Sequence, residues 1–387
     1  MPPCYTQAMK IVVLGNQGRS MVNFWSVLVR HLLTAGHEVC CMLPPGDSEA
    51  DASLTALGTR VLHYPLDRKG LNPLRDCATM RALLVLLRQE KPDLLFTSTI
   101  KPVIYGCLAA RLAGVPHVYA TITGLGYAFE ADSFFKKCVN HLGVLLYRLA
   151  LSGVEGVFFQ NRDDLATFRE AGILGSSARV LFARGVGVDT QRFAEAPLPP
   201  MDTPTFLLVG RLLEAKGLYE YAAAAKLLKA RWPQARFQVL GPPEQGLGSV
   251  PMEQMRAWQD AGDIEYLGET RDVRPHVAAC HVLVLPSWRE GTPTSVMEAM
   301  SMGRPAVVTD VPGCREVVQD GVNGRLCHVR DPQDLGRAME HFLEHPDDMV
   351  RMGAAGRDLA EREFAADLVA SRIMADMHLP AAQKERT

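Results

Sequence analysis

The feature that most constrains the fold of this chain is a repeated alternation of short apolar runs with helical patterns. In the first half the apolar runs occupy residues 10–15, 38–43, 93–99, 117–123 and 156–161. They are almost continuously apolar, which is typical of parallel strands covered on both faces, and helical stretches separate them. The pattern predicts an α/β domain with a doubly wound parallel sheet.

The same alternation starts again after a proline-rich segment. Residues 194–205 contain four prolines and are predicted to be an interdomain linker. Further apolar runs follow at residues 205–211, 236–241, 264–268, 282–287, 305–310 and 323–328. A chain of 387 residues is also too long for one ordinary core. We therefore expect two Rossmann-like domains, with residues 1–195 in the first and 196–387 in the second.

Composition limits the partners of this chain. Its net charge of −2 provides no global attraction to nucleic acid, so any basic site must be local. Nine cysteines without a CxxC pair are typical of buried thiols in a reducing cytoplasm. Residues 1–8 lack the pattern of a signal peptide, and no apolar stretch is long enough to span a membrane. We expect a cytoplasmic protein that at most lies on a membrane surface.

Ligands of such sheets bind at the carboxyl ends of the strands, so the residues that follow each strand are the candidates for a site. The loop after the first run contains Gly15 and Gly18 but is not GxGxxG, which argues against a dinucleotide site. A substrate loop and a tight turn both remain open for it. Thr99 ends the third run, and Lys101 comes two residues later beside a predicted helix start. This arrangement suits an anion, although a solvated lysine is an equally good interpretation.

Two further segments of the first half have a functional and an ordinary interpretation. In residues 121–127, Gly124 would let the backbone approach a ligand and Tyr127 would pack on a sugar, or the segment is a plain turn. Residues 134–149 form an amphipathic helical pattern with a basic side. Its apolar stripe would face the core, as in most such helices, or lie in the plane of a membrane surface.

The second half has the stronger signal. Gly210 and Arg211 directly follow a predicted strand, and Lys216 comes five residues after Arg211, before a helix. Two cations near a helix N-terminus suit a diphosphate, although an Arg/Lys pair by itself is usually surface charge.

The segment 287–300 contains two glutamates, Glu290 and Glu298, separated by Pro293. Such carboxylates serve as acid and nucleophile in glycosidases, or they bind hydroxyl groups of a ligand. A helix is predicted to begin near Thr294 with Thr292 or Thr294 as its cap, so Glu290 would lie in the loop and Glu298 in the helix. Free amides at the helix start would bind a phosphate, and Glu298 a ribose diol. The ordinary role for Glu298 is stabilisation of the helix dipole.

These residues resemble a known family. The runs VGRLLEAKG (209–217) and LPSWREGTPTSVMEAM (285–300) are similar to the donor half of the family 4 glycosyltransferases of the GT-B fold, which has two Rossmann-like domains facing a cleft. Glu290 and Glu298 match the Glu-x7-Glu pattern of that family, and Arg211 and Lys216 match its phosphate-binding pair. Residues 184–193 resemble its Gly-Val-Asp run, with Asp189 as the matching acid. The resemblance also implies that the last helix packs on the N-terminal domain.

The resemblance implies a role for each candidate residue. Catalytic residues would be Glu290, Arg211 and Lys216. Donor binding would involve Gly15, Gly18, Gly210, Arg211, Lys216, Glu290, Gly291, Thr292, Thr294, Ser295 and Glu298. Acceptor binding would involve Thr99, Lys101, Thr123, Gly124 and Tyr127.

The first domain is similar to bacterial members that extend lipid-linked oligosaccharides. This similarity implies retaining transfer of a hexose or N-acetylhexosamine, such as N-acetylgalactosamine, from a UDP-sugar. The acceptor would be an undecaprenyl diphosphate-linked saccharide used for O-antigen, capsule or other surface glycans. The enzyme would need no metal or other cofactor and would sit at the cytoplasmic face of the inner membrane through residues 134–149. Thr123 stands where many relatives have a cleft histidine, and His117 comes earlier in the strand, so no acceptor base is assigned.

Two alternative functions would use the same nucleotide-binding residues. A nucleotide-sugar epimerase would have related two-domain architecture, and a non-catalytic nucleotide-sugar-binding module would retain the fold without turnover. The intact set of Arg211, Lys216, Glu290 and Glu298 argues against the second alternative.

Overall fold

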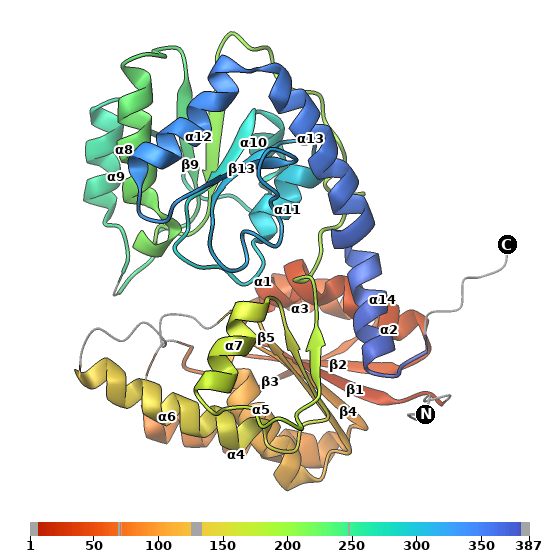
Figure 1. Ribbon diagram of the computed structural model, residues 1–387. Helices are drawn as coiled ribbons and strands as arrows, with labels where there is room; N and C mark the ends of the chain where they lie inside the picture. The colour runs from red at the N-terminus through yellow and green to blue at the C-terminus, as the bar shows by residue number, and fades with distance from the viewer. Residues whose placement is uncertain (1–6, 69, 71, 125–133, 247, 381–387) are drawn as a thin grey trace, which may run out of the picture. The chain divides into compact units, whose positions relative to one another are not determined.

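The computed structural model describes residues 7–68, 70, 72–124, 134–246 and 248–380, and within residues 134–140 only the helix and not the side chains. The chain divides into two compact units (Figure 1). Unit 1 comprises residues 1–186 and 366–387, and unit 2 comprises residues 187–365. The division thus falls before the proline-rich segment, and the last helix belongs to the first unit.

Unit 1 is built on a seven-stranded sheet whose order is β3-β2-β1-β4-β5-β6-β7. Its strands are β1 (Lys10–Leu14), β2 (Glu38–Leu43), β3 (Arg60–His63), β4 (Leu94–Ser98), β5 (His117–Ile122), β6 (Gly156–Phe159) and β7 (Val180–Phe182). Every pairing between them is parallel. The sequence order reverses direction between β1 and β4, which defines a topological switch point.

Helices cover both faces of this sheet (Figure 1). They are α1 (Gly18–Ser20), the π-helical η1 (Met21–Trp25), α2 (Ser26–Thr34), α3 (Ser48–Ala56), α4 (Pro73–Glu90), α5 (Ile100–Ala113), α6 (Phe134–Leu151), α7 (Arg162–Glu170) and α14 (Ala366–Asp376). Buried residues of α4 to α7 pack on one face, and those of η1, α2, α3 and α14 pack on the other. Because both faces are covered, the strands are apolar throughout: Val12 and Leu14 face one layer and Ile11 and Val13 the other.

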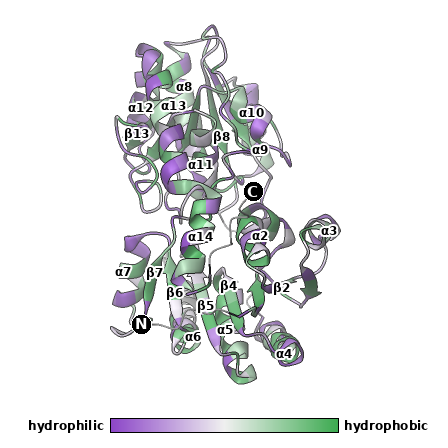
Figure 2. Cartoon of the chain, turned by 90° about the vertical axis from the view of Figure 1, so that its right-hand side faces the viewer, coloured by the Kyte–Doolittle hydropathy of each residue, from purple (hydrophilic) through white to green (hydrophobic). Residues whose placement is uncertain are grey.

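The apolar runs predicted the strands well but missed two. β3 and β7 lie at the two edges of the sheet. Each is short and only partly buried, so neither has the continuous apolar run that marks a central strand. In the hydropathy colouring of Figure 2 the inner strands β4 and β5 are mainly green, whereas the outer helix α7 is largely purple.

Unit 2 repeats the architecture with six strands in the order β10-β9-β8-β11-β12-β13. The strands are β8 (Thr205–Val209), β9 (Arg236–Leu240), β10 (Glu265–Tyr266), β11 (Val282–Leu285), β12 (Ala306–Thr309) and β13 (Gly324–Cys327), and all pairings are parallel. The helices are η3 (Glu214–Lys216), α8 (Leu218–Lys229), α9 (Met252–Asp260), α10 (Arg274–Ala278), α11 (Thr294–Ser301), α12 (Pro332–Glu344), α13 (Asp347–Leu359) and η4 (Ala360–Phe364). The prediction of two doubly wound parallel-sheet domains is confirmed.

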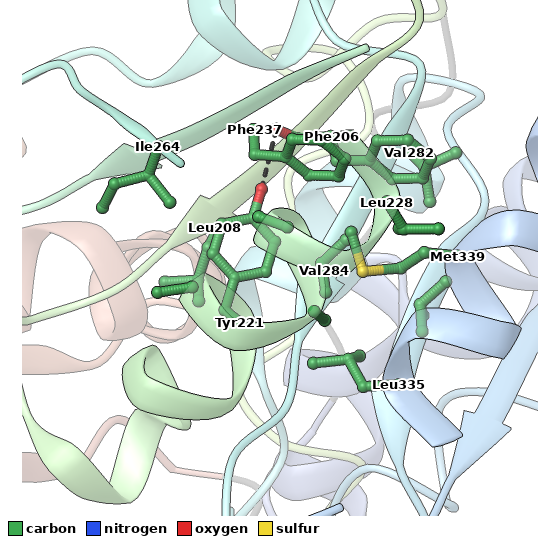
Figure 3. Close-up of a cluster of buried hydrophobic side chains, with 14 of the residues drawn as sticks. Phe206, Leu208, Tyr221, Leu228, Phe237, Ile264, Val282, Val284, Leu335 and Met339 are labelled. Carbon is green, nitrogen blue, oxygen red and sulfur yellow. Dashed lines mark hydrogen bonds between the residues drawn. The ribbon is translucent and has the colours of Figure 1, made fainter. Parts of the chain in front are cut away.

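The core of unit 2 between the sheet and α8, α9 and α12 contains mostly aliphatic side chains around two stacked rings (Figure 3). Phe206 and Phe237 lie on neighbouring strands with their ring centroids 5.3 Å apart. Tyr221 is fully buried, and its hydroxyl donates to the Phe206 carbonyl at 3.0 Å, so its one polar group is satisfied.

The proline-rich segment is held firmly on unit 2 rather than hanging free as a linker. Arg304 is fully buried, and its guanidinium donates to the carbonyls of Ala196 and Pro197. His281 accepts from the Thr205 amide at 3.0 Å through Nδ1, so its Nε2 carries the hydrogen and donates to the Pro199 carbonyl at 3.2 Å. The proline composition predicted a spacer, because composition alone does not reveal that Arg304 and His281 bind this segment.

Candidate functional site

The predicted donor-binding residues gather at one place in unit 2. Its sheet reverses direction between β8 and β11, and ligands of open α/β sheets bind at the carboxyl ends of the strands at this point. Gly210 and Arg211 follow β8 directly, and the loop with Glu290 follows β11. The structure therefore places these two candidate segments at the same edge of the same sheet.

Lys216 and Glu290 contact each other in this structure. The Lys216 ammonium donates to Glu290 Oε1, and both side chains are largely buried. Gly217, the next residue, has φ 73°, and a Cβ atom there would lie 2.1 Å from the Pro286 carbonyl oxygen at the end of β11. Only glycine permits this approach, which brings Lys216 beside the Glu290 loop. The Trp288 amide donates to the Ala215 carbonyl at 2.9 Å and joins the same two segments.

Arg211, the second predicted cation, also contacts a carboxylate. Its Nη1 donates to Glu244 Oε2 at 3.0 Å, while 53% of the arginine side chain remains exposed. Glu244 lies between β9 and α9, and the sequence analysis did not single it out. No local spacing connects residues 211 and 244, so only the folded structure reveals the pair.

The loop before α11 contains hydroxyl groups without a partner. Ser287 is fully buried and Thr292 is 9% exposed. Among the described residues, neither hydroxyl oxygen has a hydrogen-bond partner. Buried polar groups are normally bonded, so these oxygens indicate a site completed by a ligand or by water. Ser287 was missed in the sequence analysis, although its position directly after Pro286 at the end of a strand was a usable signal.

α11 begins as predicted but is capped differently. The N-cap is Pro293, with φ −73°, and no side chain caps the helix, so neither Thr292 nor Thr294 has the predicted capping role. The amides of Thr294 and Ser295 lie in the first turn, where helix N–H groups have no intrahelical acceptor. Glu290 lies in the loop and Glu298 in the helix, as predicted.

The backbone around Glu290 is fixed from the neighbouring loop. The Glu290 amide donates to the Pro312 carbonyl at 3.2 Å. Gly313 has φ 86°, and a Cβ atom there would lie 2.3 Å from the Gly291 carbonyl oxygen and 2.5 Å from that of Glu290. A side chain at position 313 would therefore displace the Glu290–Gly291 backbone.

Glu298 is the candidate with the most perturbed acidity. Burial raises the pKa of its carboxyl from 4.5 to about 7, and the positive charge of Arg192 opposes this shift. Arg192 is held in turn by Asp189, whose carboxylate accepts from the backbone amides of Gln191 and Arg192 at 3.1 and 2.9 Å. In this structure Asp189 thus orders the turn that carries Arg192.

In unit 1 the candidates lie at the switch point between β1 and β4. Gly15 follows β1, and Gly18 begins α1. A Cβ atom at Gly15 would lie 2.8 Å from Met21 Cε, and one at Gly18 would lie 2.7 Å from Ala50 Cβ. Both glycines therefore have a packing role in unit 1, and their donor-binding role stays a prediction.

Lys101 already uses its donors within unit 1. Its ammonium donates to the carbonyls of Asp67 and Gly70 and to Asp76 Oδ1, each at 2.7 Å. An ammonium has three hydrogens, so these contacts satisfy it and leave none for an acceptor phosphate. Here Lys101 fastens the segment between β3 and α4. Thr99, two residues earlier, has φ 72°, which is unusual for a β-branched residue, and its hydroxyl has no partner among the described residues.

The remaining acceptor candidates follow β5. Thr123 and Gly124 come after its carboxyl end, and Gly124 has φ 117°, which suits a backbone that turns sharply. Tyr127 lies outside the described residues. His117 begins β5, at the opposite end of the strand, where Nδ1 contacts Glu155 Oε2 at 2.7 Å. It is therefore a poor replacement for a histidine near Thr123.

The predicted apolar stripe of α6 does not face one way. Of the described members of this stripe, Leu146 packs against the unit 1 core, beside buried Tyr147 and Ala150, which are not part of the stripe. Leu142, Leu145 and Leu149 are instead exposed by 56%, 49% and 47%. The side chains of Phe134 and Phe135 lie outside the described residues. Over the described chain, no helix is long and apolar enough to cross a membrane. Nor does this part of the chain gather three or more His, Cys, Asp or Glu side chains as metal ligands. Metal independence stays a prediction.

Comparisons with known proteins agree with this geometry. Residues 203–345 match the family described as glycosyl transferases group 1, and residues 21–184 match the glycosyl transferase 4-like domain. An N,N'-diacetylbacillosaminyl-diphospho-undecaprenol alpha-1,3-N-acetylgalactosaminyltransferase of Campylobacter jejuni is 25% identical over 95% of this chain and 97% of its own.

Two further proteins extend the comparison. A phosphatidyl-myo-inositol mannosyltransferase of Mycolicibacterium smegmatis is 32% identical over 90% of this chain and 86% of its own. The crystal structure of Anabaena HepE in complex with UDP and glucose superposes with a TM-score of 0.75, at 17% identity, over 95% of this chain and 99% of that one. The chain therefore belongs to the group 1 glycosyltransferases and has their GT-B fold of two Rossmann-like domains.

Proposed function

We propose that this glycosyltransferase takes its sugar from a UDP-sugar bound to unit 2. The observation that carries the proposal is the convergence of Arg211, Lys216 and the Glu290 loop at the switch point of one sheet. Arg211, Lys216 and the first amides of α11 would hold the diphosphate, because cations and helix N-terminal amides both attract anions. The unpartnered hydroxyls of Ser287 and Thr292 would supply further donors.

The two glutamates would recognise the two ends of the donor. Glu298 would accept both ribose hydroxyls, which a carboxylate can do with its two oxygens. Glu290 would bind the sugar, since it lies in the loop before the phosphate-binding amides. On donor binding Lys216 would exchange its contact with Glu290 for the diphosphate.

The proposed reaction retains the anomeric configuration. The bond between the sugar C1 and the diphosphate oxygen breaks, and a bond from C1 to the acceptor oxygen forms on the same face. The departing phosphate takes the acceptor proton, so UDP leaves and no protein base is needed. This route is consistent with Thr123 following β5 where many relatives have a histidine. The negative charge that develops on the diphosphate would be stabilised by Arg211, Lys216 and α11, without a metal or another cofactor.

As acceptor we propose a saccharide on undecaprenyl diphosphate, used in the assembly of a surface glycan. The similarity to the Campylobacter jejuni transferase, whose name specifies such a lipid-linked acceptor, supports this class over most of both chains. A hexose or N-acetylhexosamine would be transferred at the cytoplasmic face of the inner membrane. Among the described acceptor candidates, Thr99, Thr123 and Gly124 lie directly after the ends of β4 and β5 in unit 1.

A membrane contact through α6 would bring the enzyme to this acceptor. Leu142, Leu145 and Leu149 follow one another at helical spacing and are exposed, next to exposed Arg148 and His141. An apolar row with basic flanks suits the interface of an anionic bilayer. Liposome flotation with anionic lipid tests this point. Replacing the three leucines with serine should release the protein, while Leu227→Ser on exposed Leu227 of α8 should not. Equal flotation of both variants would contradict the membrane contact.

Turnover of labelled UDP-sugars with an undecaprenyl diphosphate-linked saccharide tests the reaction. Glu290→Gln and Lys216→Ala should each lower transfer by at least about 100-fold, as expected when transition-state charge loses a partner. Glu253→Gln and Lys226→Ala are matched controls, because both residues are exposed on nearby helices of unit 2. Wild-type rates in Glu290→Gln or Lys216→Ala would refute these roles. Inversion of the donor sugar at C2 would instead indicate the epimerase, and donor binding without turnover the binding module.

A further inference from the structure

Among the described residues, Glu244 is the charged partner of Arg211, and the proposed function gives Glu244 no role. The contact joins Arg211 Nη1 to Glu244 Oε2 at 3.0 Å. Only 19% of the Glu244 side chain is exposed, against 53% for Arg211. The carboxylate is thus the more fixed member of the pair, and the guanidinium is the more accessible one.

Backbone contacts hold the two residues at this separation. The Leu212 amide donates to the Pro242 carbonyl at 3.1 Å, on one side of Glu244. On the other side the Glu214 amide donates to the Gly248 carbonyl at 2.8 Å, and the Val250 amide to the Leu212 carbonyl at 3.0 Å. Arg211 and Glu244 therefore belong to two segments that are hydrogen-bonded to each other, which distinguishes this ion pair from an ordinary surface pair.

The start of the Glu244 segment is packed as closely as a backbone allows. A Cβ atom at Gly241 would lie 1.8 Å from the Gly210 carbonyl oxygen, directly before Arg211. Gly241 has φ 158°, and its amide donates to the Gly268 carbonyl at 2.8 Å. The segment cannot move away from Arg211 without breaking these contacts.

The contact uses a small part of the guanidinium. An arginine has five N–H donors, and the bond to Glu244 occupies one of them. A long flexible side chain loses rotamer freedom when it grips a ligand, and this loss weakens binding unless the side chain is already ordered. A single carboxylate contact orders Arg211 and leaves most of its donors for an anion.

We propose that Glu244 is a positioning residue for donor binding, which holds Arg211 oriented toward the diphosphate. The inference rests on the proposed function, in which Arg211 binds the phosphates. Glu244 itself does not touch the donor. The negative charge of Glu244 repels the incoming phosphates, so Glu244 would favour donor binding only by accepting the hydrogen bond from Arg211. An amide oxygen at the same position should serve as well.

Calorimetric titration with UDP and with uridine tests this role. Glu244→Ala should weaken UDP binding by about three- to tenfold, the cost of ordering one free side chain. It should leave uridine binding unchanged, because uridine carries no phosphate. Glu244→Gln should bind UDP at least as tightly as the wild type. In steady-state kinetics Glu244→Ala should raise the KM for the donor by the same factor and change kcat little. Glu253→Ala is the control for loss of a unit 2 carboxylate.

A double variant distinguishes the positioning role of Glu244 from the proposed binding of the diphosphate by Arg211. In an Arg211→Ala background, Glu244→Ala should have no further effect on UDP affinity. Wild-type UDP affinity in Glu244→Ala, an equal loss for uridine, or an effect that persists without Arg211 would each overturn the positioning role. If Arg211→Ala bound UDP with wild-type affinity, the result would instead refute the proposal that Arg211 binds the diphosphate.

Discussion

Replacement of Glu298 by glutamine should make unit 2 more stable at neutral and alkaline pH. Glu298 lies in α11 between Met297 and Ala299, which are both fully buried. Burial raises the pKa of its carboxyl from 4.5 to about 7, because a charged carboxylate loses solvation there. The folded protein therefore holds this proton more tightly than the unfolded chain does.

The sign and size of the effect follow from linkage. A group whose pKa is raised in the folded state contributes stability that is full below the unfolded pKa and is lost as the pH rises through the folded pKa. A rise from 4.5 to about 7 corresponds to a loss of at most roughly 3 kcal/mol between about pH 4 and pH 8, because Glu298 keeps part of its surface in contact with solvent. Glutamine has a similar shape and no titration, so Glu298→Gln should avoid this loss.

Urea unfolding at several pH values measures the difference. Three of the four tryptophans, Trp232, Trp258 and Trp288, belong to unit 2, so fluorescence reports mainly on that unit. A Trp25→Phe background removes the signal of unit 1. The unfolding free energy of Glu298→Gln should rise relative to wild type as the pH increases from 4 to 8, and Glu253→Gln should show no such trend. Parallel pH curves for wild type and Glu298→Gln would refute the reasoning.

The remaining predictions concern Lys101 and Arg304, which each donate to several oxygens, and Gly217, the glycine that follows Lys216. Lys101→Met should increase proteolysis between β3 and α4, because the carbonyls of Asp67 and Gly70 lose their donor, and limited proteolysis with mass spectrometry will show the site. Arg304→Met should lower the free energy of unfolding by about 3 kcal/mol or more, measured by urea unfolding, since it strands several buried carbonyls. Gly217→Ala should impair UDP binding in a titration, because its Cβ atom collides with the Pro286 carbonyl and displaces Lys216.

The fold could be predicted because buried parallel strands leave an unmistakable apolar run. β2 and β5 coincide with their predicted runs to within a residue, since both strands are central and covered on each face. β3 and β7 escaped detection because edge strands need no such run. The proline-rich segment was interpreted as a linker because its partners, Arg304 and His281, lie about 80 to 110 residues further along the chain.

The candidate site divides in the same way. Local patterns singled out Arg211, Lys216 and Glu290 because they come shortly after strand ends, and Glu298 because of its spacing from Glu290. Their role in donor binding stays a prediction. Sequence could not show what these side chains contact. The contact of Arg211 with Glu244 and the three hydrogen bonds of Lys101 depend on tertiary structure. These contacts alter the role that we infer for each of the two cations.

In the structure, each of the two cations proposed to bind the donor is paired with a carboxylate, in a chain with a net charge of −2. Arg211 is paired with Glu244 and Lys216 with Glu290, so a carboxylate offsets the positive charge of each of these two cations. An unpaired charge is costly where it is buried, so Glu290 would stabilise the largely buried Lys216 before the donor binds. Arg211 is half exposed, so this argument does not apply to its contact with Glu244. Under the proposed function, affinity for the diphosphate would depend on the placement of these hydrogen-bond donors, because the whole chain has no net positive charge. On the proposed function, Lys216 changes partners when the donor binds and Arg211 keeps its own. The two cations, indistinguishable as a sequence motif, would thus act differently.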